Sequence, residues 1–271
     1  MDRNLPIGVF DSGVGGLTVV KEIMNQLPQE EIIYFGDTAR VPYGDKSKET
    51  VTAYSRQITR FLLSKQVKAV VVACNTASAY ALDTIRTESP VPMLGVIEPG
   101  AKTAAAATRN GRIGVIGTEG TIRSGLYEAY LRGIRPDSQV FGKACPLFVP
   151  LVEEGWIEDD VTRQVSRRYL SELLAQNVDT IVLGCTHYPL LRNVIQETAG
   201  EAVTLVNPAY ETACELRRML TDRGCLNDGG KAPAHMFYVS DGAEKFRKFA
   251  HSILPCGGAE AGEVFLKVFS L

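Results

Sequence analysis

The sequence predicts an α/β protein made of two similar lobes, each built on a parallel sheet, with a cleft between them. Apolar strands alternate with amphipathic helices along the chain, which is the pattern of parallel βαβ units. In addition, three short segments of the first half recur in the same order in the second half. We interpret this recurrence as an internal duplication that produces two equivalent lobes.

The clearest recurrence is a continuous apolar run that leads into a cysteine. The segment at 69–78 reads AVVVACNTAS and the segment at 180–189 reads TIVLGCTHYP, so Cys74 and Cys185 stand 111 positions apart (185 minus 74). A β-branched run without alternation is typical of a strand covered on both faces, as in the centre of a parallel sheet. Both cysteines are therefore predicted at the carboxyl end of a strand, where open α/β sheets bind their ligands.

Two further segments recur with nearly the same spacing. IGVFDS at 7–12 is answered by IGVIGT at 113–118, an offset of 106, and GVIEPGAKTA at 95–104 by TLVNPAYETA at 204–213, an offset of 109. Because the three recurrences keep their order and approximate spacing, we interpret them as a duplicated α/β unit whose two copies face each other across a cleft.

The first lobe is predicted from apolar runs and helical spacing. Leu17, Val20 and Ile23 recur at helical spacing, and Pro28 ends that helix. The predicted strands occupy residues 7–10, 31–35, 69–73 and 92–97, and the predicted helices occupy residues 17–27 and 51–62.

The second lobe restarts the pattern at Arg112 and has its long helix at 161–176. After residue 213 we find no further recurrence. The tail is predicted to form a helix to about Leu220, a strand at 237–239, a helix at 243–253 and a strand at 264–268. The most economical arrangement docks this tail on the first lobe. The first lobe is then predicted to comprise residues 1–98 and 208–271, and the second lobe residues 99–207.

The composition narrows the class of function. In 271 residues, 29 basic and 31 acidic side chains give a formal charge of -2 without a Lys/Arg block, so we expect no nucleic-acid partner. No apolar stretch approaches the roughly 18 residues of a membrane span, so we expect no membrane partner. Only six residues precede the apolar run at Ile7, which leaves no room for a signal peptide and favours the cytoplasm. The six cysteines contain no CxxC pair, and in that setting we expect free thiols.

The two strand-end cysteines are the first candidates for chemistry. An isolated buried cysteine usually packs as a small hydrophobic residue. Two cysteines at equivalent strand ends favour a function instead, because the amides of the following helix stabilise an anion or a thiolate. The remaining cysteines lack this context, and we expect them to be structural or incidental: Cys145, Cys214, Cys225 and Cys256.

Polar residues near these strand ends are the next candidates. Asp11 and Ser12 end the first strand; an Asp there is often a turn residue, but its place at the cleft favours a role. The hydroxyls of Ser12 and Thr118 are expected to act as ligand donors. His187 fits a packed histidine, a metal ligand or a general acid/base, and acid/base work is preferred because a lone Cys-x-His pair is a poor metal site. Glu153 is expected in a loop before a helix, where a solvated helix start is the favoured interpretation.

Two other enzyme classes share single features with this chain. The glycine loop at 13–16 with Asp37 invites a dinucleotide-binding interpretation. However, Thr18 stands where that motif needs glycine, and Asp11 would lie beside the pyrophosphate. A single cysteine with a histidine would instead fit acyl transfer through a thioester.

Two equivalent thiols on opposite sides of a cleft fit another task. Inversion of a stereocentre with an acidic C–H needs a base on one face and a proton donor on the other, and the two groups exchange roles in the reverse reaction. Thiols, whose ordinary pKa is near ~8.5, can serve in either form if a neighbouring group helps to move the proton.

The motifs resemble those of a known family. GVFDSGVGGLTV, the PYG loop at 42–44, ACNTAS and GCTHYPLL are similar to the motifs of the cofactor-independent glutamate racemases of the aspartate/glutamate racemase superfamily, and the similarity covers essentially the whole chain. The resemblance implies a two-lobed α/β pseudo-dimer that interconverts L- and D-glutamate without a cofactor or a metal. It also implies that the product, D-glutamate, is used for peptidoglycan.

The resemblance further implies roles for individual residues. Cys185 would take the α-proton of L-glutamate and Cys74 that of D-glutamate, with Asp11 beside Cys74, His187 beside Cys185, and Glu153 as an auxiliary carboxylate. The substrate pocket would be lined by Asp11, Ser12, Tyr43, Gly44, Asn75, Thr76, Thr118, Thr186 and His187.

Some alternatives stay open at this level. A related racemase acting on aspartate would share the fold and the cysteine pair. A two-lobed amino-acid-binding protein would share the cleft but would need no thiols. Glutamate is the expected small-molecule partner, and a homodimer is one candidate for the assembly.

Overall fold

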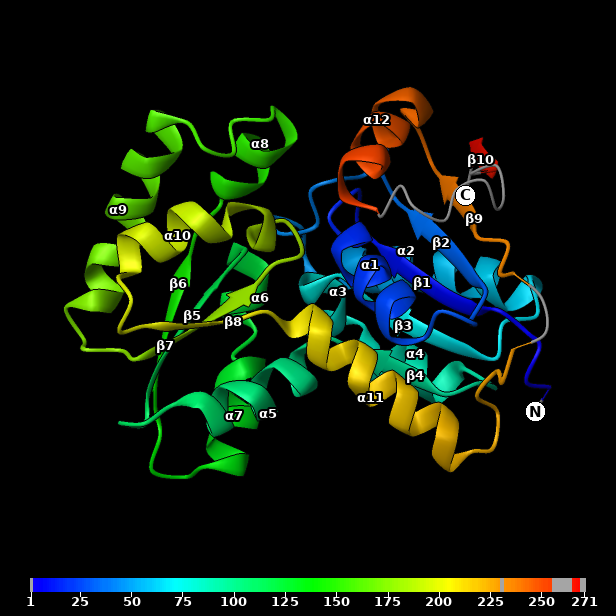
Figure 1. The fold of residues 1–271 in the computed structure, drawn as a ribbon, viewed down its shortest axis with the longest axis horizontal. Helices are drawn as coiled ribbons and strands as arrows, with labels where there is room; N and C mark the ends of the chain where they lie inside the picture. The colour runs from blue at the N-terminus through cyan, green and yellow to red at the C-terminus, as the bar shows by residue number, and fades with distance from the viewer. Residues whose placement is uncertain (1, 230–231, 255–264, 269–271) are drawn as a thin grey trace.

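Two parallel sheets form the framework of the protein. The computed structural model describes residues 2–229, 232–254 and 265–268. Within these residues the strands divide into a six-stranded sheet of order β10-β9-β2-β1-β3-β4 and a four-stranded sheet of order β6-β5-β7-β8. Every strand pair is parallel. Figure 1 shows the sheets in separate lobes, the six-stranded one on the right. The predicted fold class is therefore confirmed.

The first sheet is formed by the beginning and the end of the chain. Its strands are β1 (Ile7–Asp11), β2 (Ile32–Gly36), β3 (Ala69–Val72), β4 (Met93–Gly95), β9 (Met236–Val239) and β10 (Phe265–Val268). Its helices are α1 (Leu17–Gln26), α2 (Lys48–Ser64), α3 (Asn75–Tyr80), α4 (Leu82–Glu88) and, in the tail, α12 (Ala243–Ile253). The pairing of β9 with β2 brings the tail back to the first sheet. The lobe boundaries at residues 98/99 and 207/208 stay a prediction.

The second sheet lies between these two parts of the chain. Its strands are β5 (Arg112–Gly117), β6 (Gln139–Ala144), β7 (Thr180–Gly184) and β8 (Thr204–Val206). Its helices are α5 (Ile97–Ala107), α6 (Glu119–Arg123), α7 (Leu126–Ile134), α8 (Phe148–Glu153), α9 (Asp160–Leu174), the 3-10 helix η1 (Tyr188–Leu191) and α10 (Arg192–Ala199). The chain then returns through α11 (Pro208–Asp222), which packs against α1 and α5.

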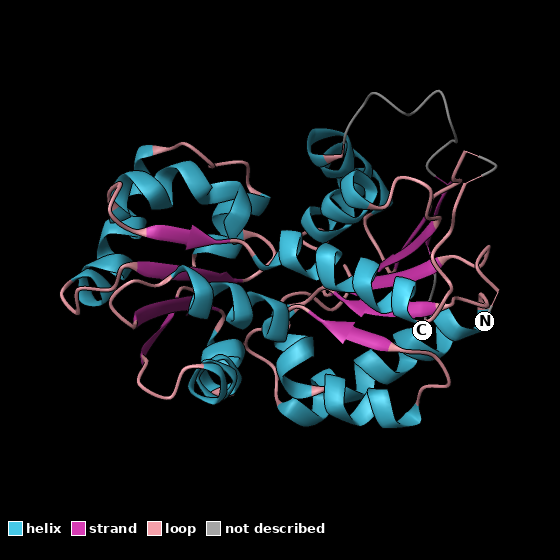
Figure 2. Ribbon diagram, turned by 60° about the horizontal axis from the view of Figure 1, so that its bottom comes forward, coloured by secondary structure: helices cyan, strands magenta, loops and turns pink. Residues whose placement is uncertain are grey.

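Helices cover both faces of each sheet, as Figure 2 shows. On the central strands of the first sheet, successive side chains enter different cores. Val9 and Val71 pack with the side chains of α1 and α11, whereas Phe10 and Val72 pack with those of α2. Because both faces are apolar, these strands read as continuous hydrophobic runs, which explains why they were recognisable in the sequence.

Two local predictions need correction, and one strand was missed. The strand predicted at 92–97 ends at Gly95, and α5 already begins at Ile97. Pro99 lies in the first turn of that helix, where its missing N–H has no intrahelical partner to lose. Strand β6 was not predicted at all. Glu153 is the last residue of α8, and not part of a loop.

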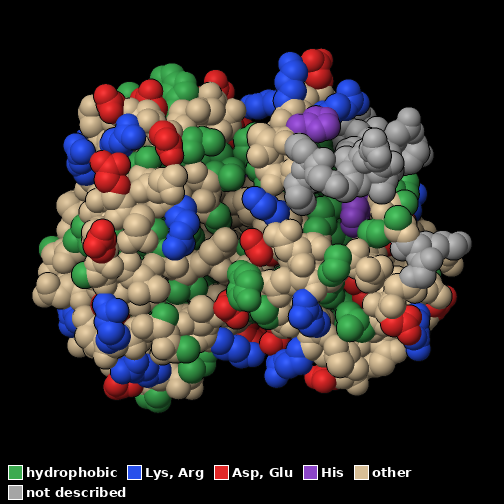
Figure 3. Space-filling model, viewed as in Figure 1, with side chains coloured by type: hydrophobic (Ala, Val, Ile, Leu, Met, Phe, Trp, Pro, Cys, Tyr) green, Lys and Arg blue, Asp and Glu red, His purple; other side chains and the backbone are tan. Residues whose placement is uncertain are grey.

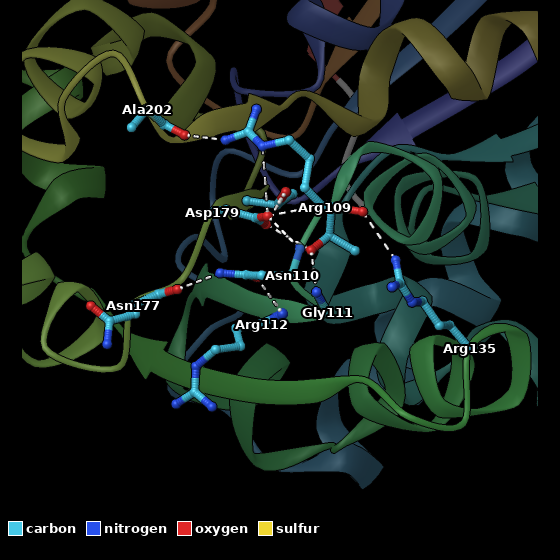
Figure 4. Close-up of polar contacts among 10 residues, drawn as sticks. Arg109, Asn110, Gly111, Arg112, Arg135, Asn177, Asp179 and Ala202 are labelled. Atoms are coloured by element: carbon cyan, nitrogen blue, oxygen red, sulfur yellow. Dashed lines mark hydrogen bonds and ion pairs between the residues drawn. The ribbon is translucent and has the colours of Figure 1, made fainter.

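A buried carboxylate fixes the edge of the second sheet that lies away from the cysteines. Asp179, just before β7, accepts hydrogen bonds from the backbone N–H groups of Arg109 at 2.7 Å and Asn110 at 2.8 Å (Figure 4). It also accepts one from the Thr108 hydroxyl at 2.6 Å. Burial opposes ionisation, but these bonds leave the pKa of Asp179 below its ordinary value. The network holds the turn between α5 and β5.

Candidate active site

The two strand-end cysteines line one pocket. Cys185 directly follows β7 and Cys74 lies two residues after β3, so each stands at the carboxyl end of a central strand, in different lobes. Both side chains are buried. The empty space around the lining, open solvent included, amounts to about 320 Å³. Its lining combines residues of both lobes: Ser12, Val41, Pro42, Tyr43, Gly44, Cys74, Asn75, Thr76, Thr118, Val149, Cys185, Thr186 and His187.

The surroundings of Cys74 keep its thiol protonated. Burial raises the pKa of Cys74 to about 12, and the negative charge of Asp11 adds to the rise. Two hydrogen bonds oppose this shift: the backbone N–H of Ala77 donates to Sγ at 3.5 Å, and Sγ lies 3.7 Å from the hydroxyl of Ser12. Because burial outweighs both bonds, Cys74 is a thiol at neutral pH.

Cys185 lies at the end of a chain of charged groups. Its Sγ is 3.9 Å from Nδ1 of His187, and Nε2 of that imidazole is 3.3 Å from Oε1 of Glu153. Lys245 of α12, in the other lobe, lies 3.6 Å from Oε2 of the same carboxylate. Burial alone would lower the pKa of His187, but its bonds to Cys185 and Glu153 raise it to about 10. The bond to His187 in turn lowers the pKa of Glu153. The imidazole is therefore an imidazolium at neutral pH.

Asp11 connects the two lobes inside the pocket wall. It is fully buried, and its carboxylate accepts hydrogen bonds from the Gly13 N–H at 3.0 Å and from the Thr186 hydroxyl at 3.3 Å. Burial raises the pKa of Asp11, while the positive charge of His187 opposes the rise. Asp11 thus bonds to the strand end that carries Cys185, and its charge acts on the pKa of Cys74.

The glycine loop after β1 allows the lobes to approach each other. A Cβ atom on Gly15 would lie 2.4 Å from Oγ1 of Thr186 and 2.6 Å from Nδ1 of His187. One on Gly16 would lie 2.4 Å from Cβ of Asp11. Sequence reasoning considered this loop for a dinucleotide phosphate, whereas the structure uses the glycines for close contact with the neighbouring site residues.

Three hydrogen bonds join the remaining site residues across the lobes. The hydroxyls of Thr76 and Thr118 are 2.8 Å apart, and the Gly120 N–H donates to the carbonyl of Gly44 at 2.8 Å. The Tyr127 hydroxyl donates to Oδ1 of Asn75, also at 2.8 Å. Sequence reasoning missed Tyr127, because a buried tyrosine in an amphipathic helix looks like any other core residue. It also missed Lys245, for which the sequence carries no signal.

These observations can be set against known proteins. A family model described as Asp/Glu/Hydantoin racemase matches residues 7–214.

The chain belongs to this racemase family.

Similar racemases are known both as sequences and as structures. A glutamate racemase of Geobacter metallireducens is 54% identical over 259 residues, which cover 96% of this chain and 95% of that protein. A crystal structure of a glutamate racemase isoform from Bacillus anthracis has a TM-score of 0.93 at 39% identity, covering 99% of this chain and 98% of that one. The glutamate racemase of Francisella tularensis, solved in complex with D-glutamate, has a TM-score of 0.90 at 37% identity, with the same coverage. The predicted enzyme class, an isomerase with glutamate racemase activity, is confirmed.

Other features of the racemase can be compared with the sequence predictions. Five cysteines are free thiols, as predicted, and Cys256 lies outside the described residues. No set of three or more His, Cys, Asp or Glu side chains in residues 2–229, 232–254 and 265–268 could hold a metal ion. Of the helices in the described part of the chain, none has the length and apolar character to cross a membrane.

The surface of the racemase carries charges of both signs. On the face in Figure 3, basic and acidic side chains are interspersed over both lobes. This pattern differs from the basic stripe that is typical of nucleic-acid-binding surfaces.

Proposed function

We propose that this racemase inverts glutamate by moving the α-proton between two thiols, Cys185 on one face of the α-carbon and Cys74 on the other. The observation that carries the proposal is that both thiols, supplied by different lobes, line the same small pocket. A single catalytic thiol would need only one of them. The neighbouring charges also differ between the two thiols in the way that a base and an acid require.

The neighbours of the two thiols fit the conversion of L-glutamate to D-glutamate. In this direction Cys185 would act as the thiolate, because the imidazole of His187, 3.9 Å from Sγ, favours a thiolate when it carries its second proton. This thiolate removes the α-proton and becomes a thiol, leaving a planar carbanion. Cys74, with its pKa raised to about 12, is protonated and delivers its own proton to the opposite face. One proton is taken and one is given, so the substrate changes only its configuration. The reverse reaction starts from the thiolate of Cys74.

The rest of the pocket is suited to an amino acid with two carboxylates. Its lining includes the hydroxyl-bearing residues Ser12, Thr76, Thr118 and Thr186, and hydroxyl groups can donate hydrogen bonds to carboxylates. We propose that the substrate contacts are made by pocket-lining residues: Ser12, Tyr43, Gly44, Asn75, Thr76, Thr118, Thr186 and His187. Asp11, the remaining predicted contact, is fully buried and does not line the pocket, so a contact with substrate would need a small movement of the wall. The racemase of Francisella tularensis holds D-glutamate, which supports a substrate of this size and charge.

The two-thiol mechanism predicts where deuterium appears. In D2O, starting from L-glutamate, the D-glutamate formed at early times should carry deuterium at the α-carbon, while the remaining L-glutamate stays protiated. Chiral separation with mass spectrometry measures both pools. Cys74→Ala and Cys185→Ala should each abolish racemisation, because each direction needs one thiol as base and the other as acid.

Cys145→Ala is the matched control, because Cys145 is a buried thiol directly after a strand end but is not among the pocket-lining residues. It should retain activity. Early deuterium in the L-glutamate pool, or substantial racemisation by either Cys74→Ala or Cys185→Ala, would contradict the mechanism.

The biological setting follows from the activity and from the family resemblance. We propose that D-glutamate made by this enzyme is used for peptidoglycan synthesis, and hence for cell-wall formation and cell shape, and that the enzyme works in the cytoplasm without a cofactor. A homodimer stays a prediction, which the molecular mass in solution would test. Assays with L-aspartate beside L-glutamate would measure how strictly the substrate is selected.

A further inference from the structure

Asp37 is a buried carboxylate that lies just outside the pocket. It directly follows β2, at the same sheet edge as Cys74, and its side chain is fully buried. Sequence reasoning considered it only as a ribose contact in a dinucleotide site, an interpretation that did not fit the glycine loop. In the structure its side chain is surrounded by donors from this chain.

Two of these donors come from the wall loop, the segment between β2 and α2 whose residues 41–44 line the pocket. Oδ2 of Asp37 accepts hydrogen bonds from Nε of Arg40 at 2.7 Å and from the hydroxyl of Tyr43. Tyr43 is buried and lines the pocket, next to Gly44. Charge-assisted hydrogen bonds of this kind are about twice as strong as neutral ones. The carboxylate therefore fixes the orientation of the Tyr43 side chain.

A third donor ties the same carboxylate to the tail of the chain. Oδ1 of Asp37 accepts from the hydroxyl of Ser240 at 2.8 Å, in the turn between β9 and α12. That hydroxyl also accepts from the Ala39 N–H at 2.9 Å. On the outer side of the loop, the guanidinium of Arg40 stacks on the ring of Tyr54 at 3.9 Å. The wall loop is thus held from three directions, with Asp37 at their meeting point.

The loop in turn contacts the second lobe. The carbonyl of Gly44 accepts from the N–H of Gly120, and a Cβ on Gly44 would lie only 2.6 Å from Cβ of Thr118. A small rotation of Tyr43 and Gly44 would therefore collide with the opposite wall or open the pocket. This tight fit makes the position of the loop important for substrate binding.

We infer that Asp37 is a positioning residue for glutamate binding, which holds the pocket wall formed by Tyr43 and Gly44 in its binding geometry. The inference rests on the pocket proposed above and adds a residue that does not itself line it. Asp37 touches neither thiol by a hydrogen bond, so its removal should affect substrate binding more than proton transfer.

The test is the substitution Asp37→Asn, which keeps the shape of the side chain. The amide cannot accept from Tyr43, Arg40 and Ser240 in the same way, because one of its two ends is a donor. If the strength of one such buried bond is used to hold the wall in its binding geometry, its loss raises KM for L- and D-glutamate by up to roughly tenfold. We expect kcat to change much less than KM.

Asp179→Asn is the matched control. It is the same substitution at another buried carboxylate that accepts hydrogen bonds from a loop. Asp179 and Cys185 lie at opposite ends of β7, about 20 Å apart. Both variants should unfold at a lower temperature, and only Asp37→Asn should raise KM. Equal KM values in the two variants at a similar loss of stability would overturn the inference.

Tyr43→Phe provides the second arm, because it removes the bond to Asp37 and keeps the ring. It should raise KM, and in its background Asp37→Asn should add clearly less than it does in the wild type. Full multiplication of the two effects would overturn the inference, as would an unchanged KM in Tyr43→Phe. If Asp37→Asn does not fold, Ser240→Ala decides in its place, because it removes a bond to the same carboxylate and Ser240 does not line the pocket; an unchanged KM in Ser240→Ala would then overturn the inference. A wild-type enzyme that fails the deuterium test would reject the two-thiol mechanism, and the KM comparison would still stand.

Discussion

The ion pair between His187 and Glu153 leads to a prediction that can be measured directly. Glu153→Gln keeps the shape of the side chain and removes its charge. In the wild type, Glu153 lies 3.3 Å from Nε2 of His187, and its side chain is only 21% exposed, so water screens the pair weakly. The bond supports a pKa of about 10 on His187. Removing the charge should therefore lower that pKa.

The size of the effect follows from the usual strength of such bonds. A hydrogen bond to a charged group contributes about 1.5–3 kcal/mol. Since one pKa unit corresponds to about 1.4 kcal/mol, the pKa of His187 should fall by about one to two units in Glu153→Gln. The pKa should still stay above the ordinary value, because Cys185 and the charge of Asp11 also act on the imidazole.

The same change alters how stability depends on pH. His187 has a higher pKa in the folded state than its ordinary value of 6.5, so the folded state binds its proton more tightly. This contribution to the free energy of unfolding is fully present below about pH 6.5 and is lost as the pH rises toward about 10. In Glu153→Gln the contribution should be smaller, and its loss should be complete at a lower pH.

Histidine-selective NMR titration measures the pKa directly. The chain has only three histidines, so His235→Gln and His251→Gln suffice to assign the signal of His187. Glu154→Gln is the control, because this neighbouring carboxylate is exposed. It should leave the titration of His187 unchanged. A pKa of His187 that is unchanged or higher in Glu153→Gln would refute the reasoning.

Two further predictions concern the contacts around this site. Lys245 is 60% exposed, so Lys245→Ala should lower the free energy of unfolding by less than about 1 kcal/mol, and by less still in high salt. Urea denaturation measures this loss. A large loss that salt does not reduce would contradict a surface ion pair with Glu153. Gly16→Ala places a Cβ 2.4 Å from that of Asp11, so it should lower the free energy of unfolding by about 1–3 kcal/mol and remove most of the activity. Gly133→Ala lies in α7 with nothing within 4 Å of the new Cβ, so it should raise the free energy of unfolding by about 0.5–1 kcal/mol. Equal thermal shifts in the two alanine variants would contradict the packing argument.

The sequence was informative where local pattern and tertiary structure agree. Strands β1, β3 and β7 are covered on both faces, so their apolar runs were recognisable and the residues that follow them could be assigned to one edge of a sheet. Strand β6 escaped because it is only partly buried and mixes polar with apolar residues. The end of β4 was misplaced because an apolar run does not distinguish a buried strand from the first turn of a buried helix.

The contacts of the site were harder to predict than its strand ends. Glu153 reaches His187 over 34 positions in the sequence, and Lys245 comes from a helix in the other lobe. Asp37 meets Ser240 over 203 positions. Such pairs depend on how the two lobes and the tail are docked, and neither periodicity nor a motif encodes that. The family resemblance supplied Glu153, whereas Lys245 and the role of Asp37 required the structure.

Thermodynamics limits how the different neighbours of the two thiols can affect the kinetics of the two enantiomers. L- and D-glutamate have the same free energy in water, so the equilibrium constant of racemisation is one, and kcat/KM must be equal in the two directions. Asp11 and Ser12 act on Cys74, whereas His187 lies beside Cys185 and Glu153 lies beside His187, so the two thiols have different neighbours. The values of kcat and KM can therefore differ between the two enantiomers, but the ratio kcat/KM must stay equal for both. A substitution on one side, such as Glu153→Gln, must change kcat/KM by the same factor for both enantiomers, and any shift in the ratio of the two kcat values must be matched by an equal shift in the ratio of the two KM values. Under the proposed mechanism, the difference between the two sides of the pocket determines how the enzyme is distributed between its two resting forms.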